Sequence, residues 1–440
     1  MTIQKGWRLG RHGRPGSYAE GGSWRAPFLL LLAIIFVGEM AAAPGRSLLP
    51  VYVEAQLGRL PQFTSALLSA QLLFGAVAAF AGGGLVDALG HKGVMVLGAS
   101  GLPLVGAVFL TGSPLALVLL WVYTGFALGV YHIGRQTYIM AIVPGRYLGT
   151  ATALGFTGLT LGGAFGSLLA APVVDRYGFR PLGIGASIAA IAVFLLVILA
   201  IPVARASPGR LRARDMVLRI FRSSQSFVGY GSVLRRPGVR LIVLMRFFAT
   251  SYWAAATLLI PLLIYRAARL PSAAAYYATA SLLFASACQL LAGRLLDRFG
   301  CPTLVVVLTA MLSGLSMVTA ALTGSLVGLY AAGIVGAGIA WALATATPSV
   351  ITELAPREEH GRTLGLTQVA TSAGMLLGTQ VGGWLVDTGA GLPFLIIGLA
   401  NLVMVPSAVA LGRCLSRERR PEDIAEQGND KVTTVRGSSE

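Results

Sequence analysis

Residues 80–92 read FAGGGLVDALGHK, and residues 291–302 read LAGRLLDRFGCP. Both stretches contain the pattern G-x-L-x-D-x-x-G, in which Asp87 and Asp297 occupy the same place, about 210 residues apart. Nearly the same offset separates three more pairs of residues: Asp175 and Asp387, Pro50 and Pro261, and Pro144 and Pro356. Four pairs at nearly one offset indicate that the chain consists of two related halves.

The composition places both halves in a membrane. Of the 440 residues, 55% are hydrophobic and only 12% are charged, whereas soluble domains carry about 25% charged residues. The apolar residues form long blocks, among them 93–110, 182–201 and 304–321. A helix needs roughly 20 mostly apolar residues to cross the hydrocarbon core, where every backbone amide must be paired internally. We therefore expect an all-α membrane protein.

The blocks predict twelve transmembrane helices in two pseudo-symmetric six-helix bundles. The expected helices are 27–53, 62–86, 93–111, 115–142, 148–172, 182–204, 241–265, 273–296, 303–323, 326–353, 364–386 and 393–412. The corresponding domains are an N-terminal tail (1–26), an N-terminal bundle (27–204), a basic linker (205–240), a C-terminal bundle (241–412) and a C-terminal tail (413–440).

The distribution of Lys and Arg predicts the orientation. Basic residues gather in the N-terminal tail, in the linker and at the start of the C-terminal tail, and the formal net charge is +17. These segments fall on one side only if each bundle has an even number of helices. The positive-inside rule then places both termini in the cytoplasm, and we expect a cell (inner) membrane. No phosphate-binding glycine loop or RNA-binding motif accompanies the charges, so they are expected to face anionic lipid and not nucleic acid.

A shorter period divides each half again. Asp175 follows Asp87, and Asp387 follows Asp297, after about 90 residues in each case, which is the length of roughly three helices. Repeated three-helix units within six-helix halves are typical of secondary transporters, whose halves move around a substrate site between them.

The stretch after the second helix resembles the hallmark motif of the major facilitator superfamily, G-x-x-x-D-x-x-G-x-K. Its matching residues are Gly83, Asp87, Gly90 and Lys92. A degenerate copy in the second half retains Asp297 and Arg298. The resemblance covers the whole membrane region and implies a fold similar to that of proton-coupled drug and metabolite antiporters. It also implies that these six residues form a conformational latch; the alternative is a plain turn with a solvated aspartate.

The fifth helix contains a second motif, GLTLGGAFGS at 158–167. It resembles the antiporter motif of the same family, G-x-x-x-G-P-x-x-G-G, at Gly158, Gly162 and Gly166, while Gly163 replaces the proline that would kink the helix. The alternative is ordinary packing of small residues between helices. A similar row of glycines on the eleventh helix favours packing.

Glu39 is the main candidate for proton coupling. It lies on the first helix, about 12 residues or roughly 18 Å from the expected cytoplasmic end. Burial at that depth disfavours the charged form of a carboxyl group unless a cation lies close, which suits a proton carrier. The alternative is a structural ion pair, for which Arg46, seven residues later on the same face, is the nearest partner in sequence.

The other charged residues inside the membrane are candidates for the site. His132 is a second candidate proton carrier, and Arg135, three residues later, either neutralises Glu39 or binds an anionic group. Arg246 on the seventh helix either extends to the interface or forms an anion site with Arg46. We also expect Tyr252 and Trp341 to line the substrate cavity, although aromatic residues at helical spacing are more often packing residues.

Two transport functions fit this pattern. The first is proton-coupled export of a small organic molecule by alternating access, and the alternative is proton-coupled uptake or exchange of an organic anion bound by Arg46, Arg135 and Arg246. No motif for ATP hydrolysis or for an intramembrane enzyme is present, so we expect neither an enzyme nor a cofactor or metal. The expected partners are a small-molecule substrate, protons and membrane lipid, and we expect a monomer.

Overall fold

The computed structural model describes residues 24–144, 147–202, 230–299, 301–354 and 360–415, and these residues form helices and no strand. In chain order the helices are α1 (Arg25–Ser47), α2 (Leu49–Ala55), α3 (Pro61–Ala99), α4 (Leu102–Ala107), the 3-10 helix η1 (Val108–Leu110), α5 (Pro114–Ile142), α6 (Leu148–Tyr177), α7 (Phe179–Ala200), α9 (Tyr230–Leu234), α10 (Pro237–Ala268), α11 (Pro271–Phe299), α12 (Cys301–Leu322), α13 (Leu326–Leu354), α14 (His360–Leu385) and α15 (Leu392–Asn401).

A helix lies within each of the twelve segments expected from the sequence. Ten helical stretches of the described chain are long and apolar enough to cross a membrane, so the protein is an integral multi-pass membrane protein. The two other segments, the first part of α3 and α14, are richer in Gly, Ser, Thr and Gln. Twelve transmembrane helices and cytoplasmic termini stay predictions.

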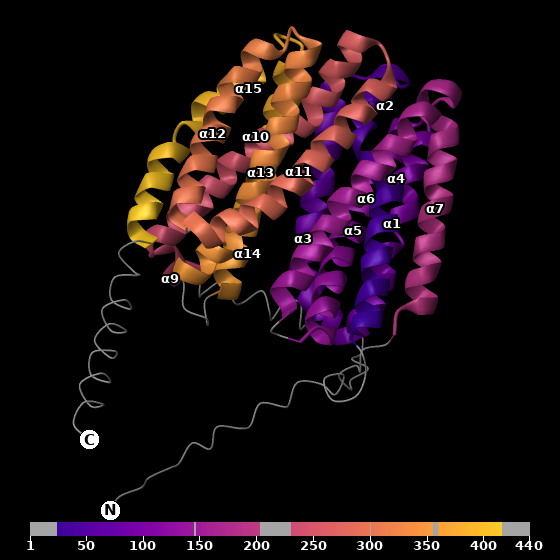
Figure 1. Ribbon diagram of the computed structural model, residues 1–440. Coiled ribbons are helices and arrows are strands. Elements are labelled where there is room, and N and C mark those ends of the chain that lie inside the picture. The colour runs from indigo at the N-terminus through magenta and orange to yellow at the C-terminus, as the bar shows by residue number, and fades with distance from the viewer. Residues whose placement is uncertain (1–23, 145–146, 203–229, 300, 355–359, 416–440) are drawn as a thin grey trace, which may run out of the picture.

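Two bundles lie side by side, α1 to α7 in one and α10 to α15 in the other (Figure 1). Each bundle has its own cluster of buried hydrophobic residues. We call the end at which the described chain begins (Trp24) and ends (Leu415) the terminal face. The opposite end, which carries the turns at 56–60, 111–113 and 323–325, is the distal face.

Glycines bring equivalent pairs of helices together in the two bundles. A Cβ atom added to Gly162 or Gly166 of α6 would overlap a backbone carbonyl of α1, and one added to Gly374 or Gly378 of α14 would overlap a carbonyl of α10. Close approach of helix backbones through small residues is the usual way in which membrane helices associate. The glycine row of the fifth predicted helix therefore serves packing.

The bundles meet along two helix pairs, α6 with α11 and α3 with α14. Ser286 of α11 donates a hydrogen bond to Thr160 of α6 over 2.7 Å, and Gln380 of α14 donates one to Ser69 of α3 over 2.7 Å. Apolar residues also meet there, because one buried cluster joins Ala170 and Ala171 of α6 with Ala274 and Ala275 of α11. Polar and apolar contacts therefore both hold the two bundles together.

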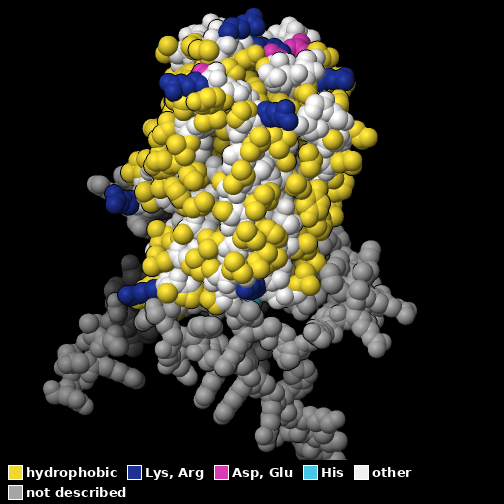
Figure 2. Space-filling model, turned by 90° about the vertical axis from the view of Figure 1, so that its right-hand side faces the viewer, with side chains coloured by type: hydrophobic (Ala, Val, Ile, Leu, Met, Phe, Trp, Pro, Cys, Tyr) yellow, Lys and Arg dark blue, Asp and Glu magenta, His cyan; other side chains and the backbone are white. Residues whose placement is uncertain are grey.

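The outer surface fits a lipid environment. Figure 2 shows hydrophobic side chains over most of the height of one face, with Asp, Glu and several Lys or Arg side chains near its upper end and further Lys or Arg side chains at its lower end. That end is the distal face, because the termini lie at the lower end in the matching view of Figure 1.

Candidate functional site

An ion pair lies halfway across the N-terminal bundle. Glu39 and Arg46 of α1 form a salt bridge, and Glu39 lies about 21 Å from the start of α1 and about 24 Å from the end of α2 at 1.5 Å per residue. The Glu39 side chain is 9% exposed and the Arg46 side chain is 37% exposed. The partner expected from sequence spacing is thus the one observed, and the pair occupies the depth at which a charge is most costly to leave alone.

A second polar group lies on α5. The guanidinium of Arg135, which is buried, donates to Nδ1 of His132 over 3.2 Å. Tyr131 precedes these two residues on the same helix and is buried. The Tyr131 hydroxyl is buried without a hydrogen-bond partner in the described part of the chain. Tyr131 therefore leaves one buried polar group of α5 unpaired within the described part of the chain.

Arg246 lies within the membrane and has no partner among the described residues. Its side chain forms no ion pair or hydrogen bond with the described residues, and it lines a small apolar pocket with Met245, Val305 and Thr347. Arg246 lies about 14 Å from the start of α10, whereas Arg46 lies about 14 Å from the opposite, distal end of its span. The two guanidinium groups thus differ in depth by roughly 20 Å, a separation too large for one small anion to contact both.

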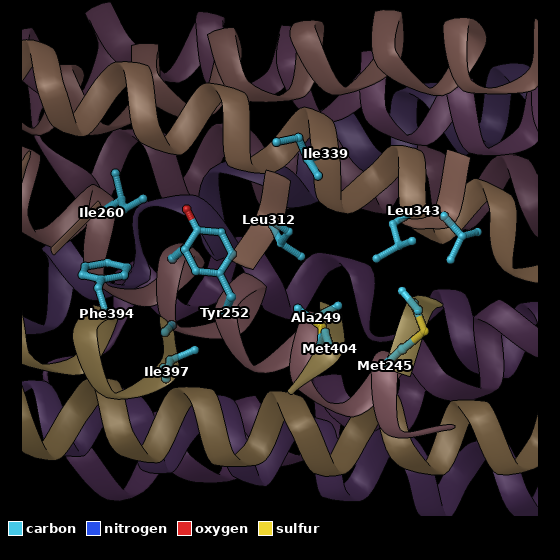
Figure 3. Packing of buried hydrophobic residues seen from close by; sticks show 14 of the residues in the cluster. Met245, Ala249, Tyr252, Ile260, Leu312, Ile339, Leu343, Phe394, Ile397 and Met404 are labelled. Atoms are coloured by element: carbon cyan, nitrogen blue, oxygen red, sulfur yellow. The ribbon is translucent and has the colours of Figure 1, made fainter. Parts of the chain in front are cut away.

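The two aromatic candidates occupy different environments. Tyr252 is fully buried in the hydrophobic cluster of the C-terminal bundle, where Figure 3 shows it between Phe394 and Leu312, and its hydroxyl lies 3.3 Å from that of Thr319. Trp341 of α13 is half-buried and meets Trp253 of α10 edge-to-face, with ring centroids 6.1 Å apart. Its indole nitrogen has no hydrogen-bond partner among the described groups. Trp341 therefore stays a candidate for the cavity, and Tyr252 acts in packing.

The proposed latch falls largely outside the described residues. The structure does not describe the side chains of Asp87, Asp297 and Arg298 or the surroundings of Gly83. The contacts of these residues therefore stay predictions. Lys92 is half-buried. Gly90 interrupts α3 with φ 71° and ψ 166°, a conformation that is essentially restricted to glycine. The chain turns at Gly90, between the second and third predicted helices.

Three charges close the distal face. Arg266, near the end of α10, donates to both carboxylate oxygens of Glu54 over 2.7–3.1 Å and to Asp387 over 2.9 Å. Glu54 belongs to the N-terminal bundle and Arg266 to the C-terminal one. A bidentate guanidinium–carboxylate pair is among the stronger polar contacts in proteins, so these residues fasten the two bundles together. We call Glu54, Arg266 and Asp387 the distal clasp.

A fourth charge acts beside the clasp. Asp175, at the end of α6, accepts a hydrogen bond of 3.0 Å from the backbone N–H of Ser272 in the first turn of α11. A carboxylate there is favoured by the helix dipole. Sequence reasoning found Asp175 and Asp387 only as repeat landmarks and missed Glu54. Glu54 and Arg266 lie about 212 residues apart, which is nearly the repeat offset, so they occupy equivalent positions of the two halves; this was the signal that could have drawn attention to them.

The sequence and the fold were compared with those of known proteins. The sequence matches the profile of the Major Facilitator Superfamily over residues 28–349 and again over 271–437. No curated protein matches the chain.

Solved structures of transporters share the fold. A POT family transporter in complex with 5-aminolevulinic acid matches with a TM-score of 0.73 at 13% identity, over 91% of this chain and 98% of that one. A POT family transporter in complex with a thioalcohol-conjugated peptide gives 0.72 at 13% identity, over 88% and 96%. The nucleoside transporter NupG, as a mutant, gives 0.62 at 16% identity, over 89% and 99%. At these identities the likeness concerns the fold alone.

Proposed function

Because this chain belongs to the major facilitator superfamily and is therefore a secondary transporter and not an enzyme, we propose that it exports a small organic molecule in exchange for protons. The proposal includes twelve transmembrane helices with both termini in the cytoplasm. The observation that carries it is the ion pair of Glu39 and Arg46 at mid-depth.

The ion pair supplies a way to couple a proton to a conformational change. Arg46 contacts the carboxylate of Glu39. A proton that binds to Glu39 cancels the negative charge on which this contact depends, and so frees Arg46 to move. Arg46 is the member of the pair with room to move, because its side chain is four times as exposed as that of Glu39. His132, bonded to Arg135, is proposed as a second proton-carrying group on the neighbouring α5.

The distal clasp supports alternating access. Its contacts, together with the bonds between Ser69 and Gln380 and between Asp175 and Ser272, hold the bundles together from the distal face inward. With cytoplasmic termini, this arrangement is closed toward the outside. The residues of the proposed latch, Asp87 among them, lie toward the terminal face and would act in the opposite state.

Transport in proteoliposomes tests the proton coupling. Vesicles are loaded with a pH-sensitive dye, and a panel of lipophilic cations and organic anions is added under an imposed pH gradient. We expect the wild-type protein to accumulate at least one compound at the expense of the gradient. Glu39→Gln should abolish this accumulation but retain exchange of labelled for unlabelled substrate, which needs no net proton movement. If Glu39→Gln leaves gradient-driven accumulation unchanged, the proposed role of Glu39 is wrong.

Arg246 favours the second candidate function, uptake or exchange of an organic anion. An arginine that has no partner in the described chain and lies within the membrane is the natural contact for an anionic group. Arg135 lies about 10 Å from the end of α5 at the terminal face, a depth similar to that of Arg246 in α10. In this version Arg246 and Arg135 bind the anion, and Arg46 stays with Glu39.

A thermal-shift screen separates the two functions. The purified protein is heated with each compound of the same panel, and ligands that bind the folded state raise the melting temperature. The export proposal expects stabilisation by lipophilic cations or neutral compounds that Arg246→Gln leaves intact. Stabilisation by anions alone, lost in Arg246→Gln, would establish the second function in its place.

A further inference from the structure

A groove of about 380 Å³ lies between α10 and α14 near the terminal face. Val243 and Phe247 of α10 and Leu366 and Val369 of α14 form its walls, and among the described lining residues Arg240 is the one that is charged. The volume falls in the range of pockets that bind small ligands. The groove lies on the terminal side of the two close contacts that α14 makes with α10 through its glycines.

The groove lies on a face of α14 that carries exposed apolar side chains. Leu366 and Ala370 share one face of α14 with Leu377 and Trp384, which follow at helical spacing. Leu377 is 42% exposed and Trp384 is 63% exposed. Val369, on the wall of the groove, is 66% exposed as well. Large apolar side chains that stay exposed along this face, up to the edge where Gln380 contacts α3 of the other bundle, are what a lipid-facing surface requires.

Arg240 is exposed and lies about 5 Å from the start of α10 at Pro237, the depth expected for lipid head groups. Its side chain has no ion pair or hydrogen bond within the described residues. The equivalent position of the N-terminal bundle, about 211 residues earlier, is Leu29, which is also exposed. Because the repeat places an apolar residue there, the fold does not require a cation at the mouth of this groove.

We propose that the groove binds an anionic phospholipid, with an acyl chain against Val243, Phe247 and Val369 and the phosphate group against Arg240. A guanidinium matches the geometry of a phosphate with two parallel hydrogen bonds. Anionic lipids are also attracted to basic residues at the membrane surface. This site is separate from the ion pair of Glu39 and Arg46 and does not depend on the direction or the substrate of transport.

Native mass spectrometry of the full-length protein in detergent tests this site. The probes are phosphatidylglycerol, phosphatidylcholine with the same acyl chains, and glycerol 3-phosphate, which carries the charge without chains. We expect one phosphatidylglycerol to be retained in preference to phosphatidylcholine, and no retention of glycerol 3-phosphate. Arg240→Leu should weaken this binding by about fivefold, the effect of one basic residue near an anionic surface.

Two further variants separate the groove from general surface charge. Val369→Trp fills the groove without a change in charge and should abolish the preferential retention. Arg413→Leu removes another exposed arginine near the terminal face, outside the groove, and should leave it intact. Equal retention of both phospholipids overturns the proposal, as does binding of glycerol 3-phosphate alone or a loss in Arg413→Leu as large as that in Arg240→Leu.

Discussion

At the scale of single residues, Gly90 shows how one backbone conformation shapes the molecule. The chain turns there with positive φ, in a region that costs other residues about 1–3 kcal/mol. We predict that Gly90→Ala lowers the melting temperature of the purified protein, measured by intrinsic fluorescence. Gly314→Ala is the matched control, because Gly314 is helical and has open space around its Cβ position; alanine there should be neutral or slightly stabilising. Equal effects of the two changes would show that the turn imposes no strain.

At the scale of helices, the glycine contacts of α6 with α1 and of α14 with α10 determine how closely these helices pack. An added methyl group at Gly166 or Gly378 would overlap a backbone carbonyl, which cannot move aside as a side chain can. We predict that Gly166→Ala and Gly378→Ala each destabilise the protein by about 1–3 kcal/mol, the usual effect of overpacking, and lower its melting temperature. Gly185→Ala on α7 has open space and should have little effect. A similar stability for all three variants would contradict this account of the packing.

At the scale of the whole molecule, the distal clasp joins the two bundles, and the proposed alternating access requires it to open. We predict that Arg266→Gln raises the population that is open at the distal face, because it removes the ion pair between the bundles and leaves Glu54 and Asp387 as neighbouring like charges. Spin labels at Gly112 and Gly324, exposed positions on equivalent distal turns, report the distance between the bundles. The matched control is Arg269→Gln, because Arg269 is an exposed arginine three residues after Arg266. This variant should leave the distance distribution unchanged. The charge exchange Glu54→Arg with Arg266→Glu, combined with Asp387→Asn so that no carboxylate faces the new glutamate, should restore it; a failure to restore it would mean that Arg266 acts through something other than the clasp.

The sequence was informative wherever a property is local or repeats along the chain. Long apolar blocks require helices, because lipid offers the backbone no hydrogen bonds, and a helix was found in each expected segment. The spacing of Glu39 and Arg46 placed them on one helical face, and they form an ion pair. The repeat of Asp87 and Asp297 predicted two related halves, and equivalent glycine contacts occur in both.

Only the tertiary structure decided which residues meet across helices that are far apart in the chain. One prediction from the sequence was an anion site formed by Arg46 and Arg246, but their helices place these residues at different depths. No sequence pattern predicted a contact between Glu54 and Arg266, yet the ends of α2 and α10 bring them together. Sequence fixes the length and the apolar face of each helix through local chemistry, whereas the contacts between bundles depend on how helices with similar surfaces pack, which no local pattern specifies.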